Sequence, residues 1–358
     1  MSDNKPKIPK SLADALKAGN VVPFVGAGVS MSVKRKNEDG TESDKSLFPS
    51  WKGFVEILAQ ALRDEHKNED ADYVLSSVNI PKPKYLEALQ HAKEELNGTL
   101  WHQLFEESFS KSKDEAYPES FRLNELIWKL ANNLIITTNV DRVFQWLCPK
   151  PSEFTILDVQ TVEYAKLRIE KVPKRPTVWH LHGHIDNKDK VIFTREQFND
   201  FYKQSGNEAK LQTLFDTLTE RPIIFIGFSL DDAYLREILE NIRKTYKDGA
   251  GNFYILFRER DIPSANFPKY VTPIPFSDFG KPLEDLVDEL ARIADDNDHE
   301  EKDNSQIEPQ KPDNSAEKER LRNHYNVPFA AKGDGFVGRE GLREKIWETL
   351  SKDRRAAI

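Results

Sequence analysis

The feature that most constrains the fold is an alternation of short apolar runs with helical stretches after residue 130. Runs rich in β-branched and aromatic residues occur in LIITTN, TVWHLHG, KVIFT, RPIIFIGF, NFYILF and YVTPIPF. Helical patterns such as REQFNDFYKQ and DAYLREILENIRKTYK separate several of these runs. Such alternation is typical of a parallel sheet that is covered by helices on both faces. We therefore predict an α/β fold, a Rossmann-like doubly wound parallel sheet.

The first 130 residues add one strand and a block of helices. The segment KSLADALKAG has helical spacing and ends at Gly19, and VVPFV then reads as a buried strand. FPSWKGFVEILAQALRDEH begins with a Pro-Ser cap signal and continues as an amphipathic helix. Further helical patterns without obvious strands predict a helical insertion over about 51–130, which would form an additional layer beside the sheet.

The C-terminal part differs in composition. KPLEDLVDELARIA reads as the closing helix of a domain over residues 1–294. Residues 295–320 hold a single aliphatic branched side chain, Ile307, and are too polar to bury a core, so we expect an acidic disordered linker. Residues 321–358 look like the start of another domain that is truncated at Ile358.

Composition excludes several classes of protein. The net charge is −8 and there is no lysine- or arginine-rich block, so we expect no direct contact with nucleic acid. No apolar run approaches the ~20 residues that span a bilayer, and the N-terminus does not resemble a secretion signal, so we expect a cytoplasmic protein with no membrane partner. Cys148 is the only cysteine, which excludes an internal disulfide and a cysteine zinc ribbon.

A glycine motif, GAGVS at 26–30, follows the first strand. Glycines at Gly26 and Gly28 let a backbone approach a pyrophosphate closely, and free N–H groups there can bind its charge. Met31 interrupts the full GxGxxG pattern. A tight turn without a ligand is the alternative interpretation.

Two further motifs follow strands in the same way. TTNVD at 137–141 places Thr138, Asn139 and Asp141 after LIITT, where helix capping is the alternative role. GFSLDD at 227–232 places Gly227, Ser229 and Asp231 after PIIFIGF, and Ser229 or Asp231 could also cap the next helix.

The fourth motif, HLHG at 180–183, contains alternating histidines. In an extended chain His180, His182 and His184 would share one face, which raises the possibility of zinc. No cysteine or carboxylate cluster beyond Asp186 supports that reading, and we expect no metal. A core histidine is the alternative for His180. A histidine can accept a proton near neutral pH, so the motif could also supply a base.

The four motifs in this order resemble the sirtuin-like family of NAD-consuming domains over roughly 12–294. The resemblance implies that Gly26, Ala27, Gly28 and Ser30 hold the NAD phosphates and ribose. It implies that Asn139 and Asp141 face the nicotinamide ribose, with Thr138 in place of a family glutamine. His182 would be the catalytic base, with Asn139 as the second catalytic residue. Gly227, Ser229 and Asp231 would surround the adenosine end.

The combined PSW (49–51), TTNVD, LHGH and FIGFSLDD set is typical of bacterial sirtuin-like effector domains. PSW stands in place of the GIPDFR-type segment that follows the glycine motif in deacetylase sirtuins. A single cysteine cannot build the zinc module of those enzymes. The tail FVGREGLREKIWETL resembles the opening of the STAND nucleotide-switch ATPases.

The resemblance implies an NAD hydrolase that releases nicotinamide and ADP-ribose, an effector that depletes NAD in antiphage defence. NAD would be the substrate, and no metal cofactor is expected. We also expect self-association through the sirtuin-like domains and through a STAND module beyond residue 358. A non-catalytic NAD or nucleotide sensor remains the alternative, followed by an NAD-dependent protein deacylase.

Overall fold

The computed structural model describes residues 8–158, 172–203, 208–228, 239–240, 252–265 and 267–296. By its internal contacts the chain divides into residues 1–303 and 304–358. All of the second unit lies outside the described residues. The expected linker beyond residue 296 and the expected STAND-like segment 321–358 therefore lie outside them as well. Ser229 and Asp231 also lie outside them, as does the expected helix DAYLREILENIRKTYK except for residues 239–240.

A seven-stranded sheet forms the centre of the first unit, and each of its strand pairs is parallel. The spatial order is β5-β6-β4-β1-β7-β8-β9. The strands are β1 (Val22–Val25), β4 (Leu134–Thr137), β5 (Thr155–Leu157), β6 (Thr177–His180), β7 (Ile223–Ile226), β8 (Phe253–Arg258) and β9 (Val271–Phe276). The predicted α/β fold with a parallel sheet is confirmed.

Strand β1 occupies the position where the order of the strands reverses. All four of its residues are buried, and it pairs with β4 on one side and with β7 on the other. Phe24 is aligned with Ile136 of β4 and with Phe225 of β7. In open α/β sheets a crevice forms beyond the carboxyl ends of the strands at such a reversal. This topology places the ends of β1, β4 and β7 beside one another.

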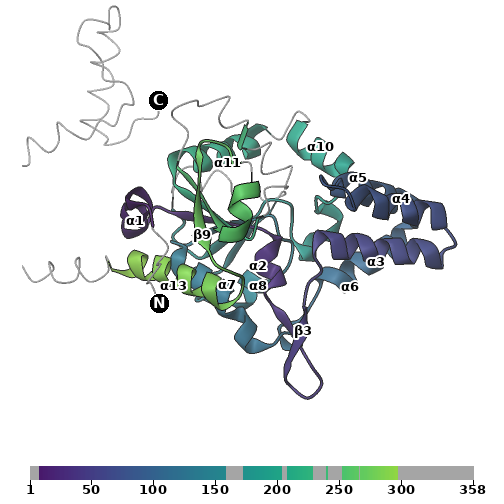
Figure 1. Cartoon of the computed structure of the whole chain (residues 1–358), viewed down its shortest axis with the longest axis horizontal. Helices are drawn as coiled ribbons and strands as arrows, with labels where there is room; N and C mark the ends of the chain where they lie inside the picture. Colours follow the sequence, from purple (N-terminus) through teal and green to yellow (C-terminus); the bar gives the residue numbers. More distant parts are fainter. Residues whose placement is uncertain are drawn as a thin grey trace, which may run out of the picture. The chain divides into compact units, whose positions relative to one another are not determined.

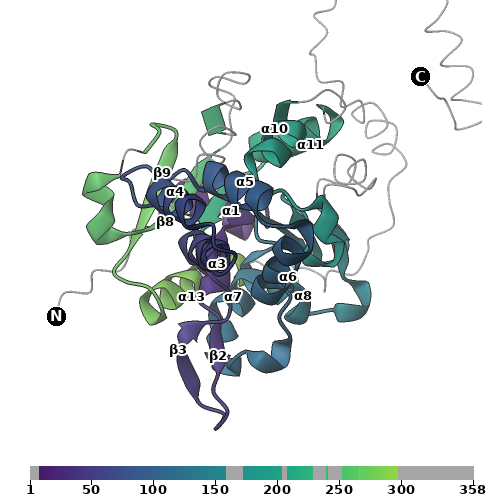
Figure 2. The same cartoon turned by 90° about the vertical axis from the view of Figure 1, so that its right-hand side faces the viewer.

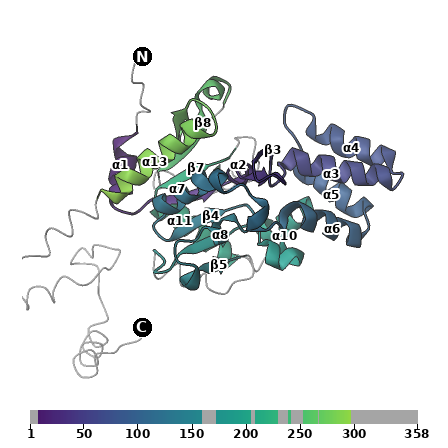
Figure 3. The ribbon, with the colours of Figure 1, turned by 90° about the horizontal axis from the view of Figure 1, so that it is seen from below.

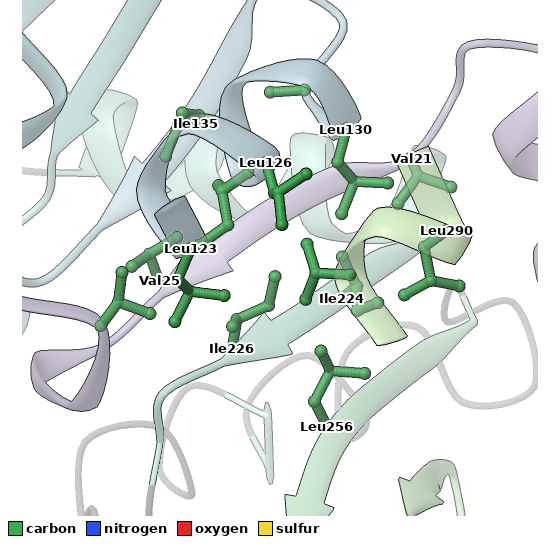
Figure 4. Close-up of a cluster of buried hydrophobic side chains, with 14 of the residues drawn as sticks. Val21, Val25, Leu123, Leu126, Leu130, Ile135, Ile224, Ile226, Leu256 and Leu290 are labelled. Atoms are coloured by element: carbon green, nitrogen blue, oxygen red, sulfur yellow. The ribbon is translucent and has the colours of Figure 1, made fainter. Parts of the chain in front are cut away.

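Helices cover both faces of the sheet. On one face α1 (Lys10–Lys17), α7 (Arg122–Leu130) and α13 (Lys281–Asp295) share one core with the sheet. Figure 4 shows side chains of α7 and α13 over Ile224 and Leu256. On the other face α10 (Arg195–Lys203) and α11 (Glu208–Glu220) bury Phe198 and Leu214 against Phe225. The sheet is therefore doubly wound, as predicted.

Four helices form an additional layer beside the sheet. They are α3 (Trp51–Asp64), α4 (Asn68–Val78), α5 (Tyr85–Glu95) and α6 (Gly98–Phe109). Figures 1 and 3 show this layer at the opposite end of the first unit from α1, and Figure 2 views it end on. Its core is built around Phe54, Leu58 and Leu89. The side chain of Ser50 accepts a hydrogen bond from Gly53 N (3.0 Å) and begins α3, as the Pro-Ser signal predicted. Helix α7 falls inside the expected insertion but packs on the sheet instead.

Several elements differ from the sequence-based expectation. The charged stretch after Ser32 forms an antiparallel hairpin of β2 (Lys34–Lys36) and β3 (Glu42–Ser46). The glycine motif is itself helical, as α2 (Ala27–Met31), and α8 (Val143–Trp146) is a single turn. KVIFT forms no strand. The described 3-10 turns are η1 (Lys113–Glu115), η2 (Pro118–Phe121), η3 (Pro151–Glu153), η4 (Ile185–Lys190) and η6 (Glu259–Ser264).

Within the described part of the chain, no helix has both the length and the apolar character needed to cross a membrane.

Candidate functional site

The glycine motif and the GFSLDD motif meet through their backbones at the ends of β1 and β7. Gly28 N donates a hydrogen bond to Gly227 O (2.9 Å), and Gly227 has a φ of +75°. A Cβ atom on Gly26 would lie 2.7 Å from Gly227 O, and one on Gly227 would lie 2.7 Å from Val29 N. Real Cβ atoms do not approach this closely, so the junction requires glycine at both positions.

A polar network joins the ends of β1 and β4. Asn139 Nδ2 donates to Gly26 O (3.0 Å) and to Ser30 Oγ (2.7 Å). Ser30 Oγ in turn donates to Asp141 Oδ2 (2.5 Å). The side chains of Ser30, Asn139 and Asp141 are buried. Three residues that the sequence analysis selected from two distant motifs are thus in direct contact, and we refer to them as the Ser30–Asn139–Asp141 network.

The direction of these hydrogen bonds defines what each group can still do. A backbone carbonyl only accepts, so the Asn139 atom that faces Gly26 O must be the amide nitrogen. Both amide hydrogens are then used within the protein, and the side-chain oxygen Oδ1 is the part of the amide that remains for a ligand. Asn139 therefore does not cap a helix with its side chain, which was the alternative role.

Asp141 combines a local role with a place in the network. Its Oδ1 accepts from Val143 N (3.0 Å), so the carboxylate also shapes the turn into α8. Burial raises the pKa of Asp141, while the hydrogen bonds from Ser30 and Val143 N act in the opposite direction. The two hydrogen bonds therefore stabilise the charged carboxylate in a buried environment that disfavours charge.

Two cavities flank α2. The first lies over the Ser30–Asn139–Asp141 network, has a volume of about 40 Å³, and is walled by aromatic side chains. Its lining residues are Ala27, Ser30, Phe48, Pro49, Trp51, Phe54, Phe109, Thr138, Asn139, Val140, Asp141 and Phe193. The second measures about 370 Å³ and includes Gly28, Gly227 and Arg258. Ala27 and Trp51 line both cavities. The second volume falls within the usual range for small-molecule pockets, and the first does not.

His182 lies two residues beyond the end of β6. Its side chain is 2% exposed, and its Nε2 is 3.2 Å from the Tyr202 hydroxyl of α10. Burial lowers the pKa of His182 to about 4. Neither of the two cavities, as the described residues line them, includes His182. The structure thus brings together the other predicted site residues that it describes, but not His182.

His180 contacts the network although the sequence analysis gave it only a core role. Its Nδ1 lies 2.7 Å from Asn139 O, and it is one of the groups that lower the pKa of Asp141. Burial, together with the neighbouring His184, lowers the pKa of His180 to about 4. The parallel pairing of β4 with β6 aligns Thr137 with His180. That register was the signal that could have identified His180, and it is not visible before the strand order is known.

The alternating histidines do not share one face. Gly183 has a φ of +91°, which breaks the extended chain between His182 and His184. The rings of His180 and His184 meet edge to face, with centroids 4.6 Å apart, whereas His182 faces Tyr202. Across the described residues, no group of three or more His, Cys, Asp or Glu side chains is arranged to hold a metal ion.

Comparisons with known proteins agree with the site. A sequence profile described as a SIR2-like domain matches residues 133–272. The chain is 24% identical over 263 residues to the NAD(+) hydrolase ThsA of Cytobacillus dafuensis, which covers 72% of this chain and 45% of that protein. It is 23% identical over 244 residues to ThsA of Bacillus cereus (strain MSX-D12), covering 68% of this chain and 44% of the relative.

The chain spans less than half the length of these curated relatives. The matched region of the profile contains TTNVD, HLHG and GFSLDD, and the glycine motif precedes it. Residues 133–272 therefore match a SIR2-like domain, which confirms the resemblance to the sirtuin-like family.

Proposed function

We propose that this chain is an NAD hydrolase that cleaves the bond between nicotinamide and ribose. The observation that carries the proposal is the Ser30–Asn139–Asp141 network, which places an amide oxygen and a carboxylate beside a cavity at the carboxyl ends of β1 and β4. The relatives named NAD(+) hydrolase ThsA support the same activity.

The chemistry suits these groups. As the bond breaks, positive charge develops on the ribose carbon and nicotinamide leaves as a neutral molecule. Fixed dipoles and a carboxylate next to the ribose stabilise that charge without having to reorganise. In this proposal Asn139 Oδ1 and Asp141 face the nicotinamide ribose, and Ser30 keeps both in position. Nicotinamide and ADP-ribose are the products.

His182 accepts a proton from a ribose hydroxyl or from the attacking water in this proposal. With a pKa of about 4 its ring is neutral at pH 7, so it is ready to accept a hydrogen bond but is a weak base. A weak base is sufficient where the leaving group needs no proton and the attacked carbon is already cationic.

In this proposal the two cavities take the two ends of the substrate once the first, of about 40 Å³, has widened. The first, over the network, would take nicotinamide and its ribose. The second, bordered by Gly28 and Gly227, would take the adenosine end, and the glycine junction between them would hold the pyrophosphate. Ser229 and Asp231 remain predicted adenosine contacts, outside the described residues.

The test is NAD cleavage by purified protein, with nicotinamide and ADP-ribose quantified by mass spectrometry. We expect Asn139→Ala and His182→Ala each to lower turnover ~10²-fold or more. Asn132→Ala is the matched control, because the Asn132 amide also donates to a backbone carbonyl, Gly19 O at 2.7 Å, but at an exposed position. Retention of most activity in both site variants would contradict the assignment.

A non-catalytic NAD-binding module is the second candidate. The narrow first cavity and the buried His182 favour it, because both describe a site that does not admit substrate in this conformation. Calorimetric binding of NAD without release of nicotinamide under any condition would identify the chain as a sensor.

We further propose a role as a cytoplasmic antiphage effector that is controlled by assembly. The support is the resemblance of FVGREGLREKIWETL to a STAND module, in residues outside those described. Assembly would raise the effective concentration of attached domains, to the millimolar range for short flexible linkers, so that weak contacts between SIR2-like domains become populated. We expect residues 1–358 alone to hydrolyse NAD slowly and a fused oligomerising tag to raise the rate. Full turnover by a monomer, independent of concentration, would contradict control by assembly.

A further inference from the structure

The last turn of α10 covers His182. The Tyr202 hydroxyl lies 3.2 Å from His182 Nε2, and the two rings meet edge to face with centroids 6.1 Å apart. Phe198, one turn earlier, packs on Tyr202 with ring centroids 4.3 Å apart and fixes the tyrosine. In this arrangement the ring that would accept the proton faces a helix rather than the cavity over the network.

The first turn of α10 is fastened to the additional helical layer. Arg195 forms an ion pair with Glu87 of α5, and Glu196 N donates to Gln90 Oε1 (3.1 Å). Figures 1 and 2 both show α10 lying beside α5. A shift of α5 relative to the sheet would therefore move α10 and change its position over His182.

The same helix fixes a wall of the first cavity. Gln197 Oε1 accepts from Phe193 N and from Thr194 N, both at 3.1 Å. Phe193 lines the first cavity, and its ring centroid is 4.8 Å from that of Trp51. One helix thus controls both the orientation of His182 and the width of a cavity of about 40 Å³.

We propose that α10 is a gate in which Tyr202 acts as a positioning residue, holding His182 in a resting orientation until α10 moves relative to α5. Movement of α10 frees the imidazole and shifts Phe193, so the base becomes available as the cavity widens. The Glu87–Arg195 pair makes the gate sensitive to the helical layer. This inference rests on the proposed NAD hydrolase function.

The first test is Tyr202→Phe, which removes the hydroxyl and keeps the ring. Loss of a hydrogen bond that stabilises the resting state should raise NAD turnover, by about 5-fold for a bond of typical net strength. Tyr254→Phe is the matched control, since the Tyr254 hydroxyl also lies within hydrogen-bond distance of a side chain, 2.8 Å from Ser11 Oγ, on a strand outside the gate. We expect no change of rate in the control.

The second test loosens the other end of α10. Glu87→Gln should raise turnover in the same direction, whereas Asp72→Asn, which breaks the comparable Arg63–Asp72 pair between α3 and α4, should not. Because both gate variants release the same helix, Tyr202→Phe with Glu87→Gln should gain less than the product of the two single effects. A strictly multiplicative gain would contradict a shared gate.

A third measurement needs no NAD. An NMR titration of the His182 ring, assigned by its loss in His182→Gln, should show its pKa rising from about 4 toward 6.5 in Tyr202→Phe, because the freed ring reaches water. A value that stays near 4, or a raised value in a protein that does cleave NAD but no faster than the parent, overturns the gate. A raised value in a protein that never cleaves NAD leaves the gate standing and removes the hydrolase function instead.

Discussion

Ser30 Oγ and Asp141 Oδ2 lie 2.5 Å apart although 111 residues separate them in the chain. Their hydrogen bond ties the helix after β1 to the turn after β4. Since Asn139 also donates to Ser30, this hydroxyl is shared by the amide and the carboxylate of the network. The serine therefore determines the geometry of both neighbours.

Ser30→Ala is expected to cost both stability and activity. The variant removes one buried hydrogen-bond partner from Asp141 and one from Asn139, while Val143 N and Gly26 O remain; leaving buried polar atoms unpaired in this way typically costs ~2–3 kcal/mol of unfolding free energy. Turnover of NAD should fall ~10²-fold because the two oxygens lose their fixed positions. Urea unfolding and the mass-spectrometric assay measure the two effects. Ser32→Ala is the control, because Ser32 Oγ donates only locally, to Val29 O at 2.7 Å. Equal effects of the two variants would show that Ser30 has no special role.

The glycine junction can be tested by separating backbone strain from steric clash. Gly227 and Gly280 have nearly the same φ, +75° and +73°, but a Cβ atom would meet Val29 N at 2.7 Å only at Gly227 and nothing within 4 Å at Gly280. Alanine at either position is strained by the positive φ, which glycine adopts readily. We expect Gly227→Ala to lose at least ~2 kcal/mol more, through the clash, together with NAD turnover. Similar melting temperatures for the two variants would refute the close approach.

Acidification is expected to destabilise the fold between about pH 6.5 and about pH 4. His180 and His182 have pKa values of about 4 in the folded protein and 6.5 as the ordinary value. The unfolded chain therefore binds more protons in this window, so stability present above pH 6.5 is lost as the pH falls. Each ring contributes a loss of ~3 kcal/mol at the lower end. Asp141 acts in the opposite direction, because burial raises its pKa and protonation relieves the buried charge.

Urea unfolding at about pH 7.5 and about pH 4.5 measures this dependence. His182→Gln should show a smaller loss between the two pH values than the parent protein, since one of the two rings with a pKa of about 4 is gone. An identical loss would mean that His182 does not titrate as a buried neutral group.

The purified protein is expected to contain far less than one zinc ion per chain. Cys148 is the only cysteine, and Gly183 prevents the three histidines of WHLHGH from sharing a face. Elemental analysis is the measurement. Stoichiometric zinc, together with loss of the fold on addition of a chelator, would reverse this expectation.

The sequence was sufficient for the sheet and for most of the network, for a physical reason. Buried strands such as LIIT and IIFI are continuous apolar runs, and the residues that follow parallel strands must meet at one edge. The positions of the motifs after the strands therefore predicted that Gly26, Ser30, Asn139 and Asp141 lie close together.

KVIFT shows where the same reasoning was wrong. Val191 and Phe193 enter the core of the helical layer, and Ile192 enters the core on the sheet. Successive side chains of the segment therefore point to opposite sides, as in a strand, and enter two different cores. The backbone of the segment nevertheless pairs with no strand of the sheet. The hairpin β2–β3 contains strands that the sequence did not predict. Its strands KRK and ESDKS are charged and largely exposed, so they carry no apolar alternation. Edge strand β5 is only three residues long, which is too short for a pattern.

The place of His182 could not be predicted, because a positive φ at Gly183 and the covering Tyr202 are tertiary facts. The sequence located the motif correctly after β6 but not the direction in which its histidines point. Ser229 and Asp231 stay predictions.

The pairing of β1 with β7 aligns Val22 with Ile223, and so has a consequence for how the protein is made. During synthesis the N-terminal strand leaves the ribosome long before its neighbour in the sheet exists. The glycine junction at Gly28 and Gly227 closes only after β7 has been translated, so a nascent or prematurely terminated chain that ends before it has no complete nucleotide site. Under the proposed function, unfinished copies would therefore cleave no NAD, before any dedicated control can act.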